Sequence, residues 1–209
     1  MKPLVIVGSG NGGRITLDVA RALGFDICGF VSSDLAKGQV VNGAPILGDD
    51  GLLEDSLFLN GNSFAVSMGP QAARRRLALK LIEGGADLPS LVHPSCVVSD
   101  HARIGPGSIL VPGAIVNCNA SIGRYCIVNA GATIEHDSVL HDGTLISPGV
   151  HFGGGTVCGE GAFVGIGACT IAGIRIGKAA VVGAGSVVIK DVPDNDVVAG
   201  NPAKSLKKT

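Results

Sequence analysis

The sequence predicts two domains, a small Rossmann-like α/β domain over residues 1–88 and a parallel β-helix over 89–193, followed by a C-terminal tail at 194–209. The first observation is an alternation of strand-like and helix-like segments in the first ninety residues. The second is a six-residue repeat that runs without a gap from Val92 to Pro193. Self-similarity at a short fixed period is typical of solenoid proteins.

The first domain contains short apolar runs and longer segments with apolar residues at helical spacing. We expect strands at residues 4–7, 26–31 and 63–67, and helices at 14–23 and 70–83. A proline stands near the first turn of the second helix, where its missing N–H is tolerated. Strands that alternate with helices favour a parallel sheet.

A glycine-rich loop joins the first strand to the first helix. Gly8, Gly10 and Gly13 fit the G-x-G-x-x-G pattern, and Asp34 follows about 20 residues later, as in domains that bind NAD. Such a domain needs two mononucleotide halves, and only about ninety residues are present before the repeat. We therefore favour a loop that holds a phosphate of another nucleotide at a helix N-terminus. A purely structural turn is the remaining alternative.

The repeat consists of seventeen units, each beginning at Val92 plus a multiple of six. Fourteen first positions are Val, Ile or Leu, and all but one of the fifth positions are small or β-branched. A helix repeats every 3.6 residues and a strand every two, so six residues fit a short strand followed by a corner. We expect the first and fifth side chains to point inward. Seven second positions are Gly, and there we expect a backbone conformation that other residues avoid.

Three successive units make one triangular coil of the expected β-helix. Successive coils would pair as parallel strands about 4.8 Å apart. Residues three units apart would then stack in columns, so the repeat assigns each residue a face and a height. A β-sandwich with glycine-rich turns does not keep a strict six-residue register over so long a segment.

Composition excludes several classes of partner. The 209 residues carry a net charge of −1, which gives no electrostatic case for nucleic acid or an anionic membrane. One Tyr and no Trp leave few platforms for stacking bases. No apolar run long enough to span a membrane and no signal peptide are present, so we expect a cytoplasmic protein.

The cysteines and histidines show no metal-binding pattern. The six Cys residues include no C-x-x-C pair, and Cys96, Cys126 and Cys158 occupy inward repeat positions, as small core residues do. His101, His141 and His151 do not share one column, and we expect no metal site.

The whole chain resembles one subgroup of the hexapeptide-repeat acyltransferases. The subgroup comprises nucleotide-sugar N-acetyltransferases of the bacillosamine type and sialic acid O-acetyltransferases. Units that begin at Ile104, Val164 and Val182 match the family consensus closely. Further markers are Val7-Gly8-Ser9-Gly10, Gly29-Phe30-Val31, Met68-Gly69, Arg74, His93-Pro94-Ser95, Val128-Asn129, Glu135-His136-Asp137 and Gly200-Asn201-Pro202. The resemblance implies a left-handed β-helix, a homotrimer with sites between neighbouring β-helices, and acetyl-CoA as cosubstrate.

The resemblance assigns the catalytic base to His136 and its acidic partner to Asp137. The chemistry agrees, because imidazole accepts a proton at cellular pH and a neighbouring carboxylate stabilises the imidazolium. A turn-capping role for Asp137 is the alternative. The repeat predicts that His136 and Gly154 stack on adjacent coils, because they are one coil of three units apart. The Gly154 N–H is therefore a candidate donor to the thioester oxygen.

The remaining site residues follow from the resemblance. Ile166 and Ala184 would line the coenzyme groove, and Leu145 occupies the position of a coenzyme-contacting histidine. Basic residues Lys204, Lys207 and Lys208 are candidates for the coenzyme phosphates, or form a solvated tail. The expected substrate contacts are Gly8, Ser9, Gly10, Asn11, Gly12, Ser32, Ser33, Gly69 and Asn129.

The sequence thus predicts an acetyl-CoA-dependent N-acetyltransferase of a nucleotide-linked amino sugar. The chain departs from the family at two positions, since Leu145 and Gly12 stand where histidines are usual. Both departures bear on which molecule accepts the acetyl group more than on acetyl-CoA as its donor. O-acetylation of sialic acid or a related sugar is the alternative activity. A non-catalytic β-helix that binds a sugar nucleotide is a third possibility, and the intact Glu135-His136-Asp137 sequence argues against it.

Overall fold

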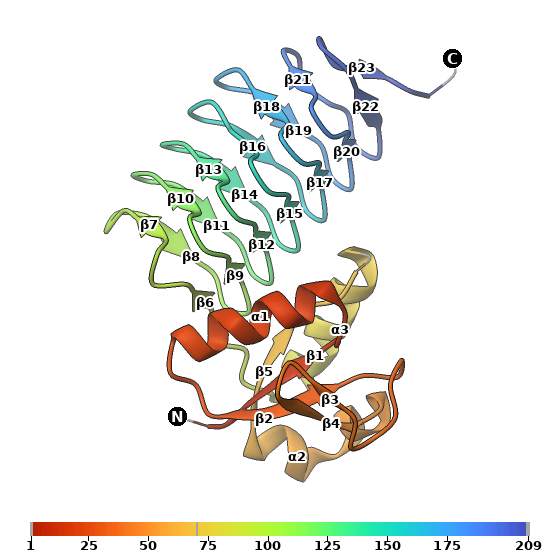
Figure 1. Cartoon of the computed structure of the whole chain (residues 1–209). Coiled ribbons are helices and arrows are strands. Elements are labelled where there is room, and N and C mark those ends of the chain that lie inside the picture. The colour runs from red at the N-terminus through yellow and green to blue at the C-terminus, as the bar shows by residue number, and fades with distance from the viewer. Residues whose placement is uncertain (1, 70, 208–209) are drawn as a thin grey trace.

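The computed structural model describes residues 2–69 and 71–207, which form an α/β domain followed by a left-handed parallel β-helix (Figure 1). The first domain has a five-stranded sheet in the order β3-β4-β2-β1-β5. Only β3 runs antiparallel to its neighbour in this sheet. The strands are β1 (Leu4–Val7), β2 (Ile27–Val31), β3 (Val40–Val41), β4 (Ala44–Gly48) and β5 (Ser63–Val66).

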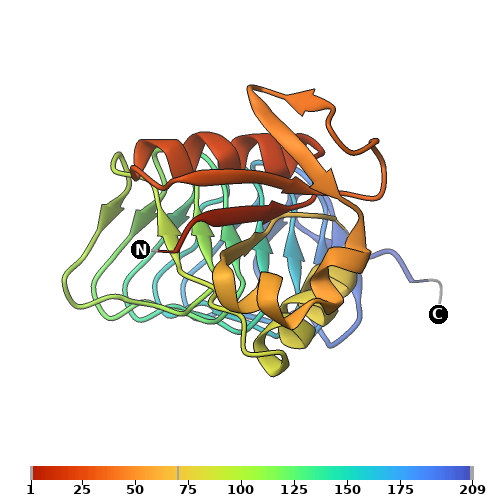
Figure 2. The same ribbon diagram turned by 90° about the horizontal axis from the view of Figure 1, so that it is seen from below.

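Helices cover both faces of this sheet. They are α1 (Asn11–Ala22), the 3-10 turn η1 (Asp50–Glu54), α2 (Ser56–Gly61) and α3 (Gln71–Glu83). Figure 2 shows α1 along one side and α2 and α3 along the other. Strand β1 alternates accordingly: Leu4 and Ile6 pack on the α1 side, and Val5 and Val7 on the α3 side. The three predicted strands and two predicted helices are confirmed, apart from Pro70, which lies outside the described residues.

The second domain is a triangular prism with three faces. Face 1 is the sheet that contains β6 (Leu91–Val92), β9 (Ile109–Leu110), β12 (Ile127–Val128), β15 (Leu145–Ile146), β17 (Phe163–Val164), β20 (Val181–Val182), β22 (Val197–Ala199) and the antiparallel β23 (Lys204–Ser205). Face 2 contains β7 (Val97–Val98), β10 (Ile115–Val116), β13 (Thr133–Ile134), β18 (Cys169–Thr170) and β21 (Val187–Val188), with His151 bridging the middle. Face 3 contains β8 (Arg103–Ile104), β11 (Ser121–Ile122), β14 (Val139–Leu140), β16 (Val157–Cys158) and β19 (Arg175–Ile176).

The predicted register of three units per coil is confirmed by the strand pairing. Ile115 pairs with Thr133, and Ile127 with Leu145. From Leu110 upward, nearly all first-position side chains are buried in one continuous core, and the fifth positions fill the space between them. Cys126 and Cys158 are fully buried there, which agrees with their predicted role as core residues.

The expected reason for the second-position glycines was wrong. The left-handed conformation occurs at the fourth position of every unit from Gly107 to Gly185, where φ lies between 45° and 77°. The second-position glycines instead allow close approach of adjacent coils. A Cβ at Gly105 would lie 2.6 Å from the backbone of Gly123, and a Cβ at Gly153 would lie 2.4 Å from the backbone of Ala172.

The final coil departs from the predicted register. Ile176 pairs with Val192 rather than with Asp194, and Val181 pairs with Val197 rather than with Ala199. The unit that begins at Val188 is therefore two residues short. Face 1 then continues past residue 193 through β22, so part of the expected tail belongs to the β-helix.

The two domains share their cores. Leu91, Ile109 and Val111 from the β-helix join the apolar cluster that contains Leu17 of α1, and Tyr125 joins the cluster on the α3 side.

A buried arginine adds a polar link between the domains. The guanidinium of Arg74 donates from Nη2 to the Gly143 carbonyl at 2.8 Å. Burial lowers the pKa of Arg74 to about 10. Together with the shared cores, this contact holds the α/β domain against the β-helix. No helix in the described part of the chain is long and apolar enough to cross a membrane.

Candidate functional site

Within the β-helix, the predicted site residues other than Leu145 and the C-terminal lysines fall on two different corners of the prism. The 1–2 corner joins the strands of face 1 to those of face 2, and carries Asn129, Ile166 and Ala184. The 2–3 corner joins face 2 to face 3, and carries His136 and Gly154. Within one chain, a face of the prism separates these two groups.

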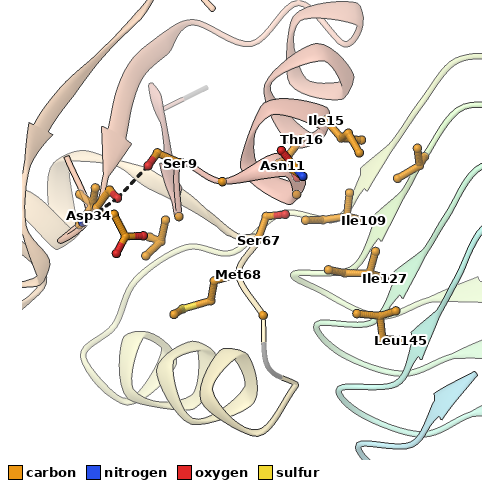
Figure 3. Close-up of a pocket in the computed structure, with 18 of the residues that line it drawn as sticks. Ser9, Asn11, Ile15, Thr16, Asp34, Ser67, Met68, Ile109, Ile127 and Leu145 are labelled. Atoms are coloured by element: carbon orange, nitrogen blue, oxygen red, sulfur yellow. Dashed lines mark hydrogen bonds between the residues drawn. The ribbon is translucent and has the colours of Figure 1, made fainter. Parts of the chain in front are cut away.

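A pocket of about 360 Å³ opens between the α/β domain and face 1, beside the 1–2 corner (Figure 3). All nine predicted substrate contacts line it, namely Gly8, Ser9, Gly10, Asn11, Gly12, Ser32, Ser33, Gly69 and Asn129. The loops that end β1, β2 and β5 converge here because parallel strands present their carboxyl ends at one edge of the sheet. Asp34, Asp50, Ser67 and Met68 also line the pocket.

The glycine-rich loop is built for close packing at the start of α1. Gly8 has a φ of 101°, and a Cβ at Gly13 would lie 1.8 Å from the Gly8 carbonyl oxygen. Helix α1 begins at Asn11, earlier than the predicted start at Arg14, and its cap residue Gly10 makes no side-chain cap. First-turn N–H groups without a side-chain cap are suited to an anion.

A hydrogen bond between two serines links two walls of the pocket. Ser9 Oγ donates to Ser32 Oγ at 2.8 Å and ties the glycine-rich loop to the end of β2 (Figure 3). A Cβ at Gly12 would lie 3.0 Å from Ser67 Oγ. A side chain at position 12 would therefore have to displace the Ser67 hydroxyl slightly.

The pocket has an apolar wall on the β-helix side. Ile109, Ile127 and Leu145 stand in one column of face 1 and point toward the glycine-rich loop (Figure 3). The structure thus places Leu145 in the interdomain pocket, and its contact with the coenzyme stays a prediction. Ile109 and Ile127 were not identified as site residues from the sequence. They precede Leu145 by two coils and one coil, so the repeat already placed all three in one column.

On the 2–3 corner, His136 and Asp137 form a hydrogen-bonded pair. His136 Nδ1 lies 2.8 Å from Asp137 Oδ2, and both side chains are more than half exposed in the single chain. Asn119 Nδ2 donates to the other carboxylate oxygen at 3.1 Å. The hydrogen bonds from His136 and Asn119 lower the pKa of Asp137, so its carboxylate stays ionised.

Gly154 lies directly against the His136 ring. A Cβ at Gly154 would lie 2.4 Å from His136 Nε2, so only glycine leaves the imidazole in its place. The predicted stacking of these two residues is confirmed. Because Nδ1 faces the carboxylate, Nε2 is the nitrogen that is available to accept a proton above the Gly154 backbone.

The other predicted residues are more dispersed. Ile166 and Ala184 are exposed on higher coils of the 1–2 corner. Lys204 lies on β23 and Lys207 beyond it, both exposed, while Lys208 falls outside the described residues. His93 contacts Ser95 Oγ and His151 contacts Thr133 Oγ1. In residues 2–69 and 71–207, no group of three His, Cys, Asp or Glu side chains could hold a metal ion.

Known proteins resemble this chain in both sequence and structure. Residues 3–81 match the PglD N-terminal domain family. The acetyltransferase domain of PglB from Neisseria gonorrhoeae FA1090 is 36% identical, with a TM-score of 0.94, over 99% of this chain and 100% of that one. PerB from Caulobacter crescentus, solved with CoA and GDP-perosamine, is 36% identical, with a TM-score of 0.93, over 99% of this chain and 98% of that one.

A curated relative supports the same grouping over a shorter alignment. UDP-N-acetylbacillosamine N-acetyltransferase of Bacillus subtilis (strain 168) is 36% identical over 118 residues, which span 53% of this chain and 52% of the relative. The chain thus matches about half the length of this relative. Together with the full-length structural matches and the hexapeptide register, the comparison shows that the chain belongs to the hexapeptide-repeat nucleotide-amino-sugar N-acetyltransferases.

Proposed function

We propose that the chain transfers an acetyl group from acetyl-CoA to the amino group of a nucleotide-linked amino sugar. Its structural relatives include proteins solved with acetyl coenzyme A and with CoA together with GDP-perosamine. The observation in this chain that carries the proposal is the His136–Asp137 pair, with Nε2 of the imidazole directed over Gly154.

His136 acts as the general base. The sugar amine attacks the carbonyl carbon of the thioester while Nε2 accepts a proton from the nitrogen. The carbon–sulfur bond then breaks, and the proton passes to the CoA sulfur, so that the products are the amide and the free thiol. Asp137 holds Nδ1 protonated and stabilises the imidazolium. A base in this position contributes about 10²–10⁴-fold in rate.

Gly154 serves the acyl donor. The Gly154 backbone lies next to the His136 ring. None of the described residues accepts a hydrogen bond from the Gly154 N–H. This N–H stabilises the negative charge that develops on the thioester oxygen. Ile166 and Ala184 contact the coenzyme along the 1–2 corner, and the lysines near the C-terminus attract its phosphates.

The nucleotide occupies the interdomain pocket. Its phosphates bind at the N-terminus of α1 and the sugar extends past Asn129. Asp34 and Asp50 provide carboxylates for the base or ribose, because both line the same pocket. In this arrangement the glycine-rich loop binds the phosphates of a nucleotide sugar and not those of NAD.

The complete site forms between neighbouring copies of the chain. The pocket lies beside the 1–2 corner and the base lies on the 2–3 corner, with face 2 between them. If three copies pack with face 2 toward a common axis, the 2–3 corner of one copy meets the 1–2 corner of the next. We therefore propose a homotrimer in which each site takes His136 from one chain and the pocket from its neighbour.

The protein acts in the cytoplasm in this proposal. All six cysteines are free thiols, as is usual in a reducing compartment. This location also keeps the reaction where acyl-CoA is available.

A substrate panel tests the proposed reaction. UDP-, dTDP- and GDP-linked 4-amino sugars and free sialic acid are each incubated with acetyl-CoA, and thiol release is followed with a chromogenic disulfide. We expect turnover with at least one nucleotide amino sugar and formation of an amide. Turnover with sialic acid alone would show that the enzyme is an O-acetyltransferase and would contradict the proposed N-acetylation. The absence of turnover with every acceptor would contradict the proposal as well.

A further inference from the structure

Asn119 is linked to the catalytic pair although the sequence pattern gave it no role. It stands one full coil before Asp137, so the two residues occupy the same position on adjacent coils of the 2–3 corner. Asn119 Nδ2 donates to Asp137 Oδ1 at 3.1 Å. The other oxygen, Oδ2, faces His136 Nδ1 at 2.8 Å. One carboxylate therefore joins an amide on one side to the imidazole on the other.

The backbone at both positions is unusual for residues with side chains. The φ angles are 58° at Asn119 and 60° at Asp137, both in the left-handed region. Glycine fills the equivalent fourth position in most units from Gly107 to Gly185. Asn tolerates this conformation better than most residues, but glycine does so without steric cost. Tyr125 and Ala179 also have side chains at this position. Asn119 and Asp137, however, lie one coil apart and share a hydrogen bond.

The geometry restricts the Asp137 side chain. An aspartate on an exposed corner can rotate freely about its side-chain bonds, and each rotation would turn Oδ2 away from Nδ1. A hydrogen bond from Asn119 to Oδ1 opposes that rotation. A second donor also keeps the carboxylate ionised, in agreement with the lowered pKa of Asp137.

We propose that Asn119 is a positioning residue, which fixes the Asp137 carboxylate so that the His136 proton stays on Nδ1 and Nε2 remains free to accept a proton. This inference rests on the proposed acetyl transfer for its kinetic consequences. The position of the imidazole proton can be measured without any turnover.

Asn119→Gly is the direct test, because it removes the amide and suits the left-handed backbone. We expect kcat to fall roughly tenfold, the effect of losing one hydrogen bond to a charged group, with KM for both substrates unchanged. Asn119→Asp places a second carboxylate beside Asp137 and should lower kcat further. Asn195→Gly is the matched control, since Asn195 also has a φ of 58° and is exposed far along the chain. Its kcat should equal that of the parent protein.

The second readout is the ¹⁵N chemical shifts of the His136 imidazole in labelled protein, assigned with His136→Gln. We expect the parent and Asn195→Gly to show mainly the Nδ1-protonated tautomer, and Asn119→Gly to show a mixture. Unchanged shifts together with unchanged kcat in Asn119→Gly would overturn the inference. If the parent protein acetylates no acceptor, the proposed function fails, while the tautomer measurement still decides the role of Asn119.

Discussion

The two corners that carry the candidate site differ in how far the rest of the chain encloses them. Beside the 1–2 corner, the pocket is enclosed by two domains that share an apolar core. On the 2–3 corner, His136 and Asp137 are more than half exposed and are held by their mutual hydrogen bond and by neighbours on adjacent coils. One corner thus borders an enclosed pocket, whereas the other presents polar side chains on an exposed surface.

In the proposed function, the two corners have different tasks. Nucleotide-sugar binding would depend on the junction between the domains, which lies within a single chain. Acetyl transfer would depend on side chains on successive coils, which a neighbouring chain would shield from water. Changes on the two corners should therefore alter different kinetic parameters.

The largest expected effect is on the 2–3 corner. His136→Ala removes the base, and kcat should fall about 10²–10⁴-fold, while the Kd for the nucleotide sugar stays unchanged because the pocket is separate. Thiol-release kinetics and calorimetric titration measure the two quantities. A large loss of nucleotide-sugar binding in this variant would contradict the separation of the corners.

Gly154→Ala should produce the next largest effect. The added methyl group would lie 2.4 Å from His136 Nε2 and must displace the ring, so we expect kcat to fall about 10²-fold with little change in Tm. Gly155→Ala is the control, because a Cβ there meets no atom within 4 Å but the residue has a φ of 68°. That variant should lose about 1 kcal/mol of stability and keep its kcat. Equal activity in the two variants would remove the steric argument.

The smallest effect is expected in the pocket beside the 1–2 corner. Leu145→Ala removes part of the apolar wall of the pocket, and KM for the nucleotide sugar should rise about three- to tenfold. KM for acetyl-CoA should stay the same if Leu145 serves the pocket alone. The opposite pattern, a rise only in KM for acetyl-CoA, would assign Leu145 to the coenzyme.

Much of this fold was predictable because the repeat is strict. One aliphatic side chain per unit requires an inward position in every unit, and the strand pairs follow from the coil of three units. The same arithmetic placed Gly154 over His136. It also related Asn119 to Asp137 and Ile109 to Leu145, but those relations carry no chemistry until the side-chain directions are known.

Other features depended on tertiary contacts that no local pattern encodes. The reason for glycine at second positions is the backbone of the next coil, and the short final coil follows from pairing of Ile176 with Val192. No element was predicted between residues 34 and 62, where Asn42-Gly43, with positive φ angles of 47° and 79°, joins β3 to β4. The position of Leu145 in the pocket depends on how the domains dock.

The most direct test of the central claim is complementation between two inactive variants. His136→Ala lacks the base, and Gly10→Phe fills the pocket without backbone strain, since a Cβ there meets no atom within 4 Å and φ is −69°. When the two chains are co-expressed in equal amounts, a site shared between chains should be intact in about one quarter of cases, and activity should recover to that fraction of the parent value. Activity no greater than the sum of the separate variants would show that each chain uses its own His136 and pocket, and would contradict the account.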